Sequence, residues 1–102
     1  MHPLIENNRE ALRELCRRLR VHRLDLFGSA TGTDFDPSSS DLDFLVQFEN
    51  LAPDQYADAY FGLLEGLQRL FGRPVDLVTE SSITNPYFRQ SIEQTRVPLY
   101  AA

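Results

Sequence analysis

The sequence is poor in the features that mark secreted, disulfide-bonded and membrane-bound proteins. It has a single cysteine, Cys16, so an internal disulfide is impossible and a reducing, cytoplasmic environment suits the chain. No apolar run approaches the roughly 20 residues that a membrane-spanning helix needs. Glu6, Asn7 and Asn8 interrupt the start of the chain, where a signal peptide would have a basic and then an apolar stretch. We therefore expect a cytoplasmic protein without a membrane partner.

Positive charge is also scarce. The 102 residues include 10 Lys and Arg against 15 Asp and Glu, a net charge of −5. Proteins that grip a nucleic-acid backbone are normally basic, because neutralisation of phosphates dominates their affinity, so direct tight nucleic-acid binding is not expected. A nucleotide ligand is still compatible with this charge, since divalent metals can supply the positive charge. With 42% hydrophobic and 25% charged residues, the composition predicts one globular domain over residues 1–102.

The hydrophobic pattern predicts helices alternating with strands. Helical periodicity or helix-start signals are found at residues 5–19, 53–71 and 81–94, the last as one helix or a helix pair. Short apolar or alternating runs that predict strands are found at residues 23–27, 42–48 and 75–78, with an extended tail, a candidate edge strand, at 97–100. Gly72 suits the end of the second helix, and Asn85 with Pro86 suits the start of the last. This order predicts an α/β (α+β) fold, a small mixed β-sheet with helices packed on it.

Two aspartates stand at the start of the second predicted strand. Side chains alternate between the faces of a strand, so Asp41 and Asp43 project from the same side, and their carboxylates repel each other unless a positive charge lies between them. The preceding strand ends at Gly28-Ser29, where freed N–H groups can face an anion and glycine lets a phosphate approach. No Lys follows in the P-loop arrangement. The pattern predicts a metal site beside a phosphate-binding turn.

A third aspartate, Asp76, lies among the apolar residues of the third strand. Alone it would be an acid on the exposed face of an edge strand, but beside Asp41 and Asp43 it is favoured as a metal ligand, because a two-metal site needs several converging carboxylates. Hard oxygen ligands favour Mg²⁺ or Mn²⁺ over zinc. Two such ions would hold a nucleoside triphosphate, with Asp76 as the base for an attacking hydroxyl. Without metal, we expect one of these carboxyls to have a raised pKa. Residues 34–40 are predicted as a loop, with Asp34 and Asp36 as turn-formers.

Three motifs resemble the DNA polymerase β-like nucleotidyltransferases: FGS at 27–29, SDLDFLV at 40–46 and VDLV at 75–78. The chain's size and its ending, NPYFRQSIEQTRVPLYA, resemble the minimal nucleotidyltransferase branch of that superfamily. The resemblance implies a polymerase β-like fold in which Gly28 and Ser29 hold the triphosphate. It implies that Asp41 and Asp43 bind two Mg²⁺ ions, with Mn²⁺ as a substitute, and that Asp76 completes the site and deprotonates the acceptor. ATP would be the nucleotide donor.

Minimal nucleotidyltransferases typically work beside a HEPN-type RNase toxin, as its antitoxin. The resemblance therefore implies that this chain binds such a toxin in a hetero-oligomer and transfers AMP to one of its tyrosines. Two departures bear on activity: the segment 30–40 is one residue longer than usual, and Ala30-Thr31-Gly32 stand where many members carry an Arg. The alternative is a catalytically weak or inactive antitoxin that neutralises its toxin by binding. Transfer to a small molecule such as an aminoglycoside is a third hypothesis, disfavoured because no second, substrate-binding domain is evident.

Overall fold

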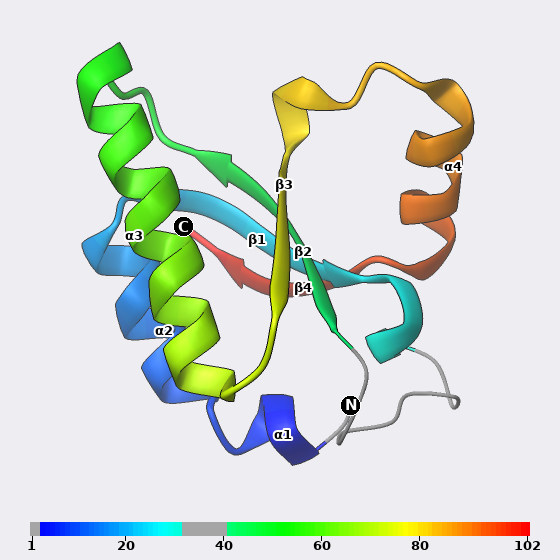
Figure 1. Cartoon of the computed structure of the whole chain (residues 1–102), viewed down its shortest axis with the longest axis horizontal. Helices are drawn as coiled ribbons and strands as arrows, with labels where there is room; N and C mark the ends of the chain where they lie inside the picture. Colours follow the sequence, from blue (N-terminus) through cyan, green and yellow to red (C-terminus); the bar gives the residue numbers. More distant parts are fainter. Residues whose placement is uncertain (1–2, 32–40) are drawn as a thin grey trace.

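The computed structural model describes residues 3–31 and 41–102 and centres them on a four-stranded mixed sheet (Figure 1). The strands are β1 (Val21–Phe27), β2 (Leu42–Phe48), β3 (Val75–Thr79) and β4 (Val97–Ala101). Their order in the sheet is β3-β2-β1-β4. β1 pairs antiparallel with both β2 and β4, whereas β2 and β3 run parallel. The helices are α1 (Pro3–Glu6), α2 (Arg9–Arg18), α3 (Pro53–Phe71) and α4 (Pro86–Thr95), with 3₁₀ turns η1 (Gly28–Thr31) and η2 (Glu80–Ser82).

Helices cover both faces of the sheet, so each central strand has two buried sides (Figure 1). The larger core lies under α2 and α3, where Leu24, Phe44 and Leu63 are completely buried. A smaller cluster of Phe27, Leu45, Ile83 and Ile92 lies on the opposite face, under α4. The predicted mixed sheet with packed helices is confirmed, in the predicted order of elements.

The first helix is the main departure from the predicted elements. The pattern predicts one helix over residues 5–19, but the chain forms α1 and α2 with a break at Asn7-Asn8. The Asn8 side chain donates a hydrogen bond from Nδ2 to the Leu4 carbonyl at 2.8 Å, which is how asparagine competes with continuous helix. The apolar residues at helical spacing continue on one side across the break, and Cys16 among them is completely buried. That burial raises the pKa of the Cys16 thiol to about 12, so this cysteine is a core residue.

The remaining boundaries follow the local signals in the sequence. α3 begins at Pro53 and ends at Phe71, directly before Gly72, whose φ of +63° is the left-handed conformation that glycine adopts easily. The Asn85 side chain caps α4 by accepting a hydrogen bond from the Tyr87 N–H at 2.8 Å. Within residues 3–31 and 41–102, no helix is long and apolar enough to cross a membrane.

Both outer strands of the sheet carry a feature that limits further pairing. β4, at one end of the strand order, contains Pro98, which has no N–H to donate. At the other end, the carbonyl of Leu77 in β3 accepts a hydrogen bond from the hydroxyl of Tyr60 in α3 at 2.7 Å. α3 thus closes over β3 as well as covering the main core.

Candidate active site

The parallel pairing of β2 and β3 brings two of the predicted aspartates together. Asp43 is the direct partner of Asp76, and Phe27 of β1 is the partner of Asp43 on its other side. Paired residues of neighbouring strands lie about 4.8 Å apart and project from the same face. This is the face of the smaller cluster, opposite the core under α2 and α3. Asp41 is exposed and lies immediately before β2.

Negative charge is concentrated at this point. Burial raises the pKa of the Asp43 carboxyl above its ordinary value, and the charges of Asp76 and Asp41 raise it further. A raised pKa is the expected result of crowding three carboxylates, although burial is the larger cause. In the described part of the chain, the side chains of Asp43 and Asp76 have no hydrogen bond or ion pair to offset this repulsion. A cation between them would supply that compensation.

The donor set fits a hard divalent cation in its chemistry. Asp41, Asp43 and Asp76 offer only carboxylate oxygens, which Mg²⁺ and Mn²⁺ prefer. As the side chains lie, no three Asp, Glu, His or Cys groups within residues 3–31 and 41–102 are arranged to hold a metal ion together. A bound cation would therefore have to draw the exposed side chains of Asp41 and Asp76 toward the half-buried Asp43.

The turn after β1 lies directly against the Asp43 carboxylate. Gly28 opens η1 with a φ of +76°, a conformation that other residues adopt only at a cost. A Cβ atom built at Gly28 would lie 2.5 Å from Oδ2 of Asp43, which is far inside van der Waals contact. Glycine is therefore required at position 28 for two reasons, its backbone conformation and the close approach to Asp43.

The backbone amide of Gly28 is already engaged within the protein. Its N–H donates a hydrogen bond to Oγ1 of Thr95, the last residue of α4, at 2.9 Å. The Thr31 hydroxyl donates to the Gly28 carbonyl at 2.8 Å, which closes the turn. The expectation that freed N–H groups at this turn face an anion thus does not hold for the Gly28 amide itself. The Ser29 side chain and residues 32–40, with Asp34 and Asp36, lie outside the described residues.

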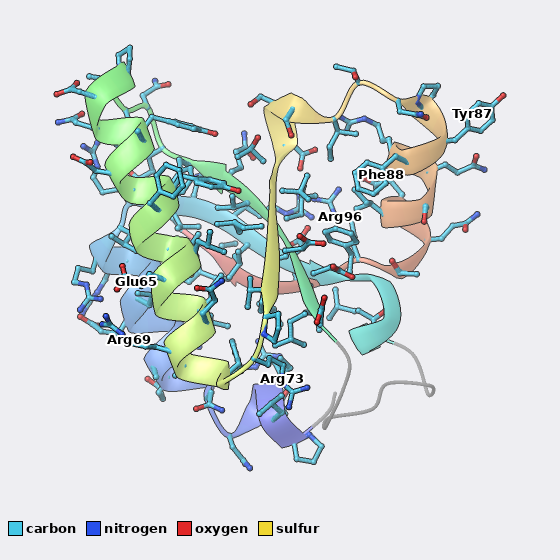
Figure 2. The ribbon with its side chains drawn as sticks, viewed as in Figure 1. Glu65, Arg69, Arg73, Tyr87, Phe88 and Arg96 are labelled. Atoms are coloured by element: carbon cyan, nitrogen blue, oxygen red, sulfur yellow. The ribbon has the colours of Figure 1, made fainter. Side chains whose placement is uncertain are left out.

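The sequence pattern did not reveal a buried ion pair on the same face of the sheet. Asp25 of β1 is completely buried and accepts a hydrogen bond from Nε of Arg96 at 2.6 Å. Nε of Arg23 donates to the same carboxylate at 3.3 Å. Arg96 directly follows α4 and lies between that helix and the sheet (Figure 2). An acidic residue within a predicted strand was the available signal, but nothing local identifies a partner 71 positions away.

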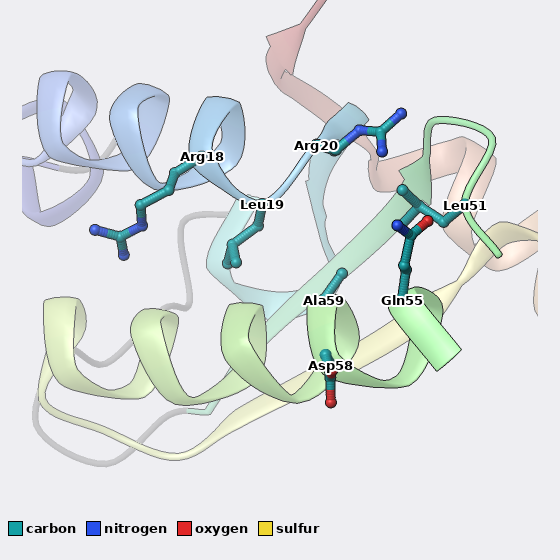
Figure 3. A pocket seen from close by; sticks show the side chains of 7 residues that line it. All are labelled: Arg18, Leu19, Arg20, Leu51, Gln55, Asp58 and Ala59. Carbon is teal, nitrogen blue, oxygen red and sulfur yellow. The ribbon is translucent and has the colours of Figure 1, made fainter. Parts of the chain in front are cut away.

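A separate hollow lies on the side of α2 and α3. It has a volume of about 250 Å³, and Arg18, Leu19, Gln55 and Asp58 are among its lining residues (Figure 3). It lies between the end of α2 and the first turns of α3. None of Gly28, Asp43 and Asp76 lines it. The charged face beside the Gly28 turn is therefore the candidate active site, and this hollow is not part of it.

Comparisons with known proteins agree with the fold described above. Residues 8–99 match the family model described as "Nucleotidyltransferase domain". A Methanocaldococcus jannaschii protein named "Putative protein adenylyltransferase MJ1379" is 37% identical over 78 residues, which cover 76% of this chain and 75% of that protein. A solved structure described as a "putative minimal nucleotidyltransferase" is 31% identical with a TM-score of 0.66, covering 91% of this chain and 90% of that chain.

A further solved structure shows the shared fold at lower identity. It is a complex of a tri-AMPylated HEPN toxin from Shewanella oneidensis with an MNT antitoxin. The matched chain is 20% identical, with a TM-score of 0.65, and the match covers 96% of the present chain and 73% of that chain.

Proposed function

The chain belongs to the nucleotidyltransferase domain family, and from this membership we propose that it is a metal-dependent enzyme that transfers AMP from ATP to a protein hydroxyl. The acceptor we propose is a tyrosine of a HEPN-type RNase toxin, for which this chain serves as antitoxin in a hetero-oligomer. The adenylyltransferase name of the archaeal relative and the AMPylated toxin in the Shewanella complex support this choice of reaction and partner. Residues 1–102 would act as a single nucleotidyltransferase domain.

The observation that carries the proposal is the direct pairing of Asp43 with Asp76 beside the Gly28 turn. Asp41, Asp43 and Asp76 would hold two Mg²⁺ ions, or Mn²⁺, whose charge binds the triphosphate and lowers the pKa of the acceptor hydroxyl. Gly28 and Ser29 would hold the triphosphate against these carboxylates. The acceptor oxygen attacks the α-phosphorus, the bond to pyrophosphate breaks, and the hydroxyl proton passes to the Asp76 carboxylate.

The position of Asp76 is compatible with an acceptor on another protein. β3 is the outer strand of the sheet, and Asp76 is exposed on it. A side chain presented by a partner can therefore reach Asp76 without any rearrangement of the sheet. The raised pKa of Asp43 means that a negative charge is unfavourable at this carboxyl. A bound cation would therefore stabilise the ionised form of Asp43.

The test is transfer of label from α-labelled ATP with Mg²⁺, with and without the product of the neighbouring gene as the candidate acceptor protein. We expect label on that protein in the presence of the wild-type chain and none with the Asp41→Asn/Asp43→Asn variant. Asp54→Asn is the matched control, because Asp54 is an exposed acid in the first turn of α3, remote from the site in the fold, and should leave transfer unchanged. No label with ATP, GTP, CTP or UTP, in either Mg²⁺ or Mn²⁺, would refute the proposed reaction.

The second candidate function is that of an antitoxin that masks its toxin without modifying it. The observation in its favour is that the three aspartates, as their side chains lie, do not form a ready metal site among the described residues. This function predicts a tight complex and full inhibition of the toxin's RNase activity in the absence of nucleotide. It also predicts that Asp41→Asn/Asp43→Asn inhibits as well as the wild-type chain, whereas the enzyme requires both aspartates.

A further inference from the structure

The C-terminal turn of α4 is bonded to β1 and its following turn at two neighbouring positions. Thr95 accepts the hydrogen bond from the Gly28 N–H at 2.9 Å, and Arg96 forms the ion pair with Asp25 at 2.6 Å. Asp25 lies near the end of β1, and Gly28, three residues later, opens η1. The C-terminal end of α4 is thus bonded both to β1 and to the turn that faces Asp43.

The Thr95 hydroxyl is oriented to act as an acceptor. A hydroxyl has a single proton to donate, and that of Thr95 lies within reach of two carbonyls of its own helix, Ser91 at 3.3 Å and Ile92 at 3.4 Å. With its proton directed back along α4, the oxygen presents a lone pair to the Gly28 N–H. The bond therefore depends on α4 remaining in place.

The Arg96 ion pair holds that end of α4 in place. Asp25 is completely buried, and the Arg96 side chain is 13% exposed. Arg96 also pairs with Glu80 of η2 at 3.5 Å and with Glu93 of α4. Arg23 also donates to Asp25 at 3.3 Å, but the shorter bond to Arg96 is the one that joins the end of α4 to β1, and its loss is unfavourable because Asp25 is completely buried. It fixes the backbone of Arg96, and hence that of the adjacent Thr95, relative to β1.

We propose that Thr95 is a positioning residue for nucleoside triphosphate binding: its hydroxyl holds the Gly28 turn against Asp43, and the Arg96–Asp25 pair holds Thr95. This inference rests on the function proposed above. Removal of the hydroxyl leaves the Gly28 N–H without its partner, and the turn is then free to leave the position against Asp43 in which it would hold the triphosphate. The aspartates themselves keep their places on β2 and β3, so nucleotide binding suffers and the chemical step does not.

The variants that test this are Thr95→Val, which keeps the shape and removes the hydroxyl, and Thr95→Ser, which keeps the hydroxyl. Thr84→Val is the matched control, since Thr84 is exposed in the segment before α4. We expect Thr95→Val to raise KM for ATP about tenfold with kcat within about threefold, and to speed amide exchange of Gly28 about tenfold. Thr95→Ser and Thr84→Val should stay within about twofold of the wild-type chain in KM for ATP, in kcat and in the rate of Gly28 amide exchange. All three variants should remain folded at the assay temperature, as judged by the midpoint of thermal unfolding.

Three outcomes would overturn the inference. The first is a wild-type KM or wild-type Gly28 exchange in Thr95→Val. The second is a parallel loss of kcat, affinity and thermal stability, which would indicate a general structural role. The third is failure of Thr95→Ser to restore KM.

The proposed transfer reaction can fail separately. If the wild-type chain labels no acceptor, the affinity for AMP-PNP with Mg²⁺, measured by calorimetry, replaces KM in the same comparison. Equal affinity of Thr95→Val and wild type would then overturn the role of Thr95, and a tenfold weaker affinity would support it. A wild-type chain that binds no nucleotide would refute both proposals.

Discussion

Two glycines with similar backbones and different surroundings allow a sharp test of the candidate site. Gly28 and Gly72 both have positive φ, +76° and +63°. A Cβ atom at Gly28 would lie 2.5 Å from Oδ2 of Asp43, whereas a Cβ atom at Gly72 would meet nothing within 4 Å. Gly28→Ala and Gly72→Ala therefore share the backbone cost of alanine in the left-handed region, and only Gly28→Ala disturbs a proposed site residue.

The expected magnitudes follow from these contacts. The left-handed conformation costs a residue with a Cβ atom about 1–2 kcal/mol, so both variants should lose about that much unfolding free energy. The contact at Gly28 is also roughly 1 Å shorter than the ordinary carbon–oxygen separation. The Asp43 carboxylate can rotate away to relieve it, which spares the fold and displaces the carboxylate. A displacement of about 1 Å in a catalytic group can cost about a hundredfold in rate.

Urea unfolding and label transfer, measured on the same preparations, separate the two effects. We expect similar losses of stability in the two variants, transfer reduced about a hundredfold in Gly28→Ala, and transfer within about twofold of wild type in Gly72→Ala. Wild-type transfer by Gly28→Ala would show that the approach of the turn to Asp43 is irrelevant to function. An equal loss of transfer in Gly72→Ala would show that activity merely follows stability.

Two further predictions concern charge. Asp25→Asn should lower the unfolding free energy by about 2 kcal/mol, because it removes the completely buried carboxylate that binds Arg96, which keeps Glu80 and Glu93 as charged partners. Glu65→Gln, which breaks the exposed Glu65–Arg69 pair on the outside of α3 (Figure 2), should cost less than about 0.5 kcal/mol, and equal losses in urea unfolding would contradict this contrast. Asp43→Asn should raise the unfolding free energy at pH 7, because the raised pKa of Asp43 means that its ionised form is less stable in the folded than in the unfolded chain. The gain should vanish below about pH 4, where Asp43 is protonated in both states, so a pH-independent gain would argue against the charge explanation.

Local signals were sufficient for most of the fold. Pro53 and Gly72 bound α3, and Asn85 caps α4, because each of these residues acts on the backbone next to it. Asn8 was the exception among local features. Its side chain bonds back to Leu4 and ends α1, whereas the apolar stripe continues across the break and indicates one helix.

The arrangement of the candidate site was only partly accessible from the sequence. Strand alternation places Asp41 and Asp43 on one side, but it cannot say which strand lies beside them; the proximity of Asp76 depends on the parallel pairing of β2 and β3. The bonds of Thr95 to Gly28 and of Arg96 to Asp25 join residues 67 and 71 positions apart, respectively. Such contacts depend on how α4 docks on the sheet, and no spacing rule reports that.

The two outer strands have a consequence for how the protein meets other molecules. An unpaired strand edge is a template on which another chain can continue the sheet, and this is a route to fibrils and disordered aggregates. A second molecule that approaches β3 finds the Leu77 carbonyl already bonded to Tyr60, and one that approaches β4 meets Pro98, which has no hydrogen to offer. Sheet growth from copy to copy is therefore hindered at both ends. We expect the protein to remain dispersed at high concentration and to recognise its partner through side chains instead of backbone pairing.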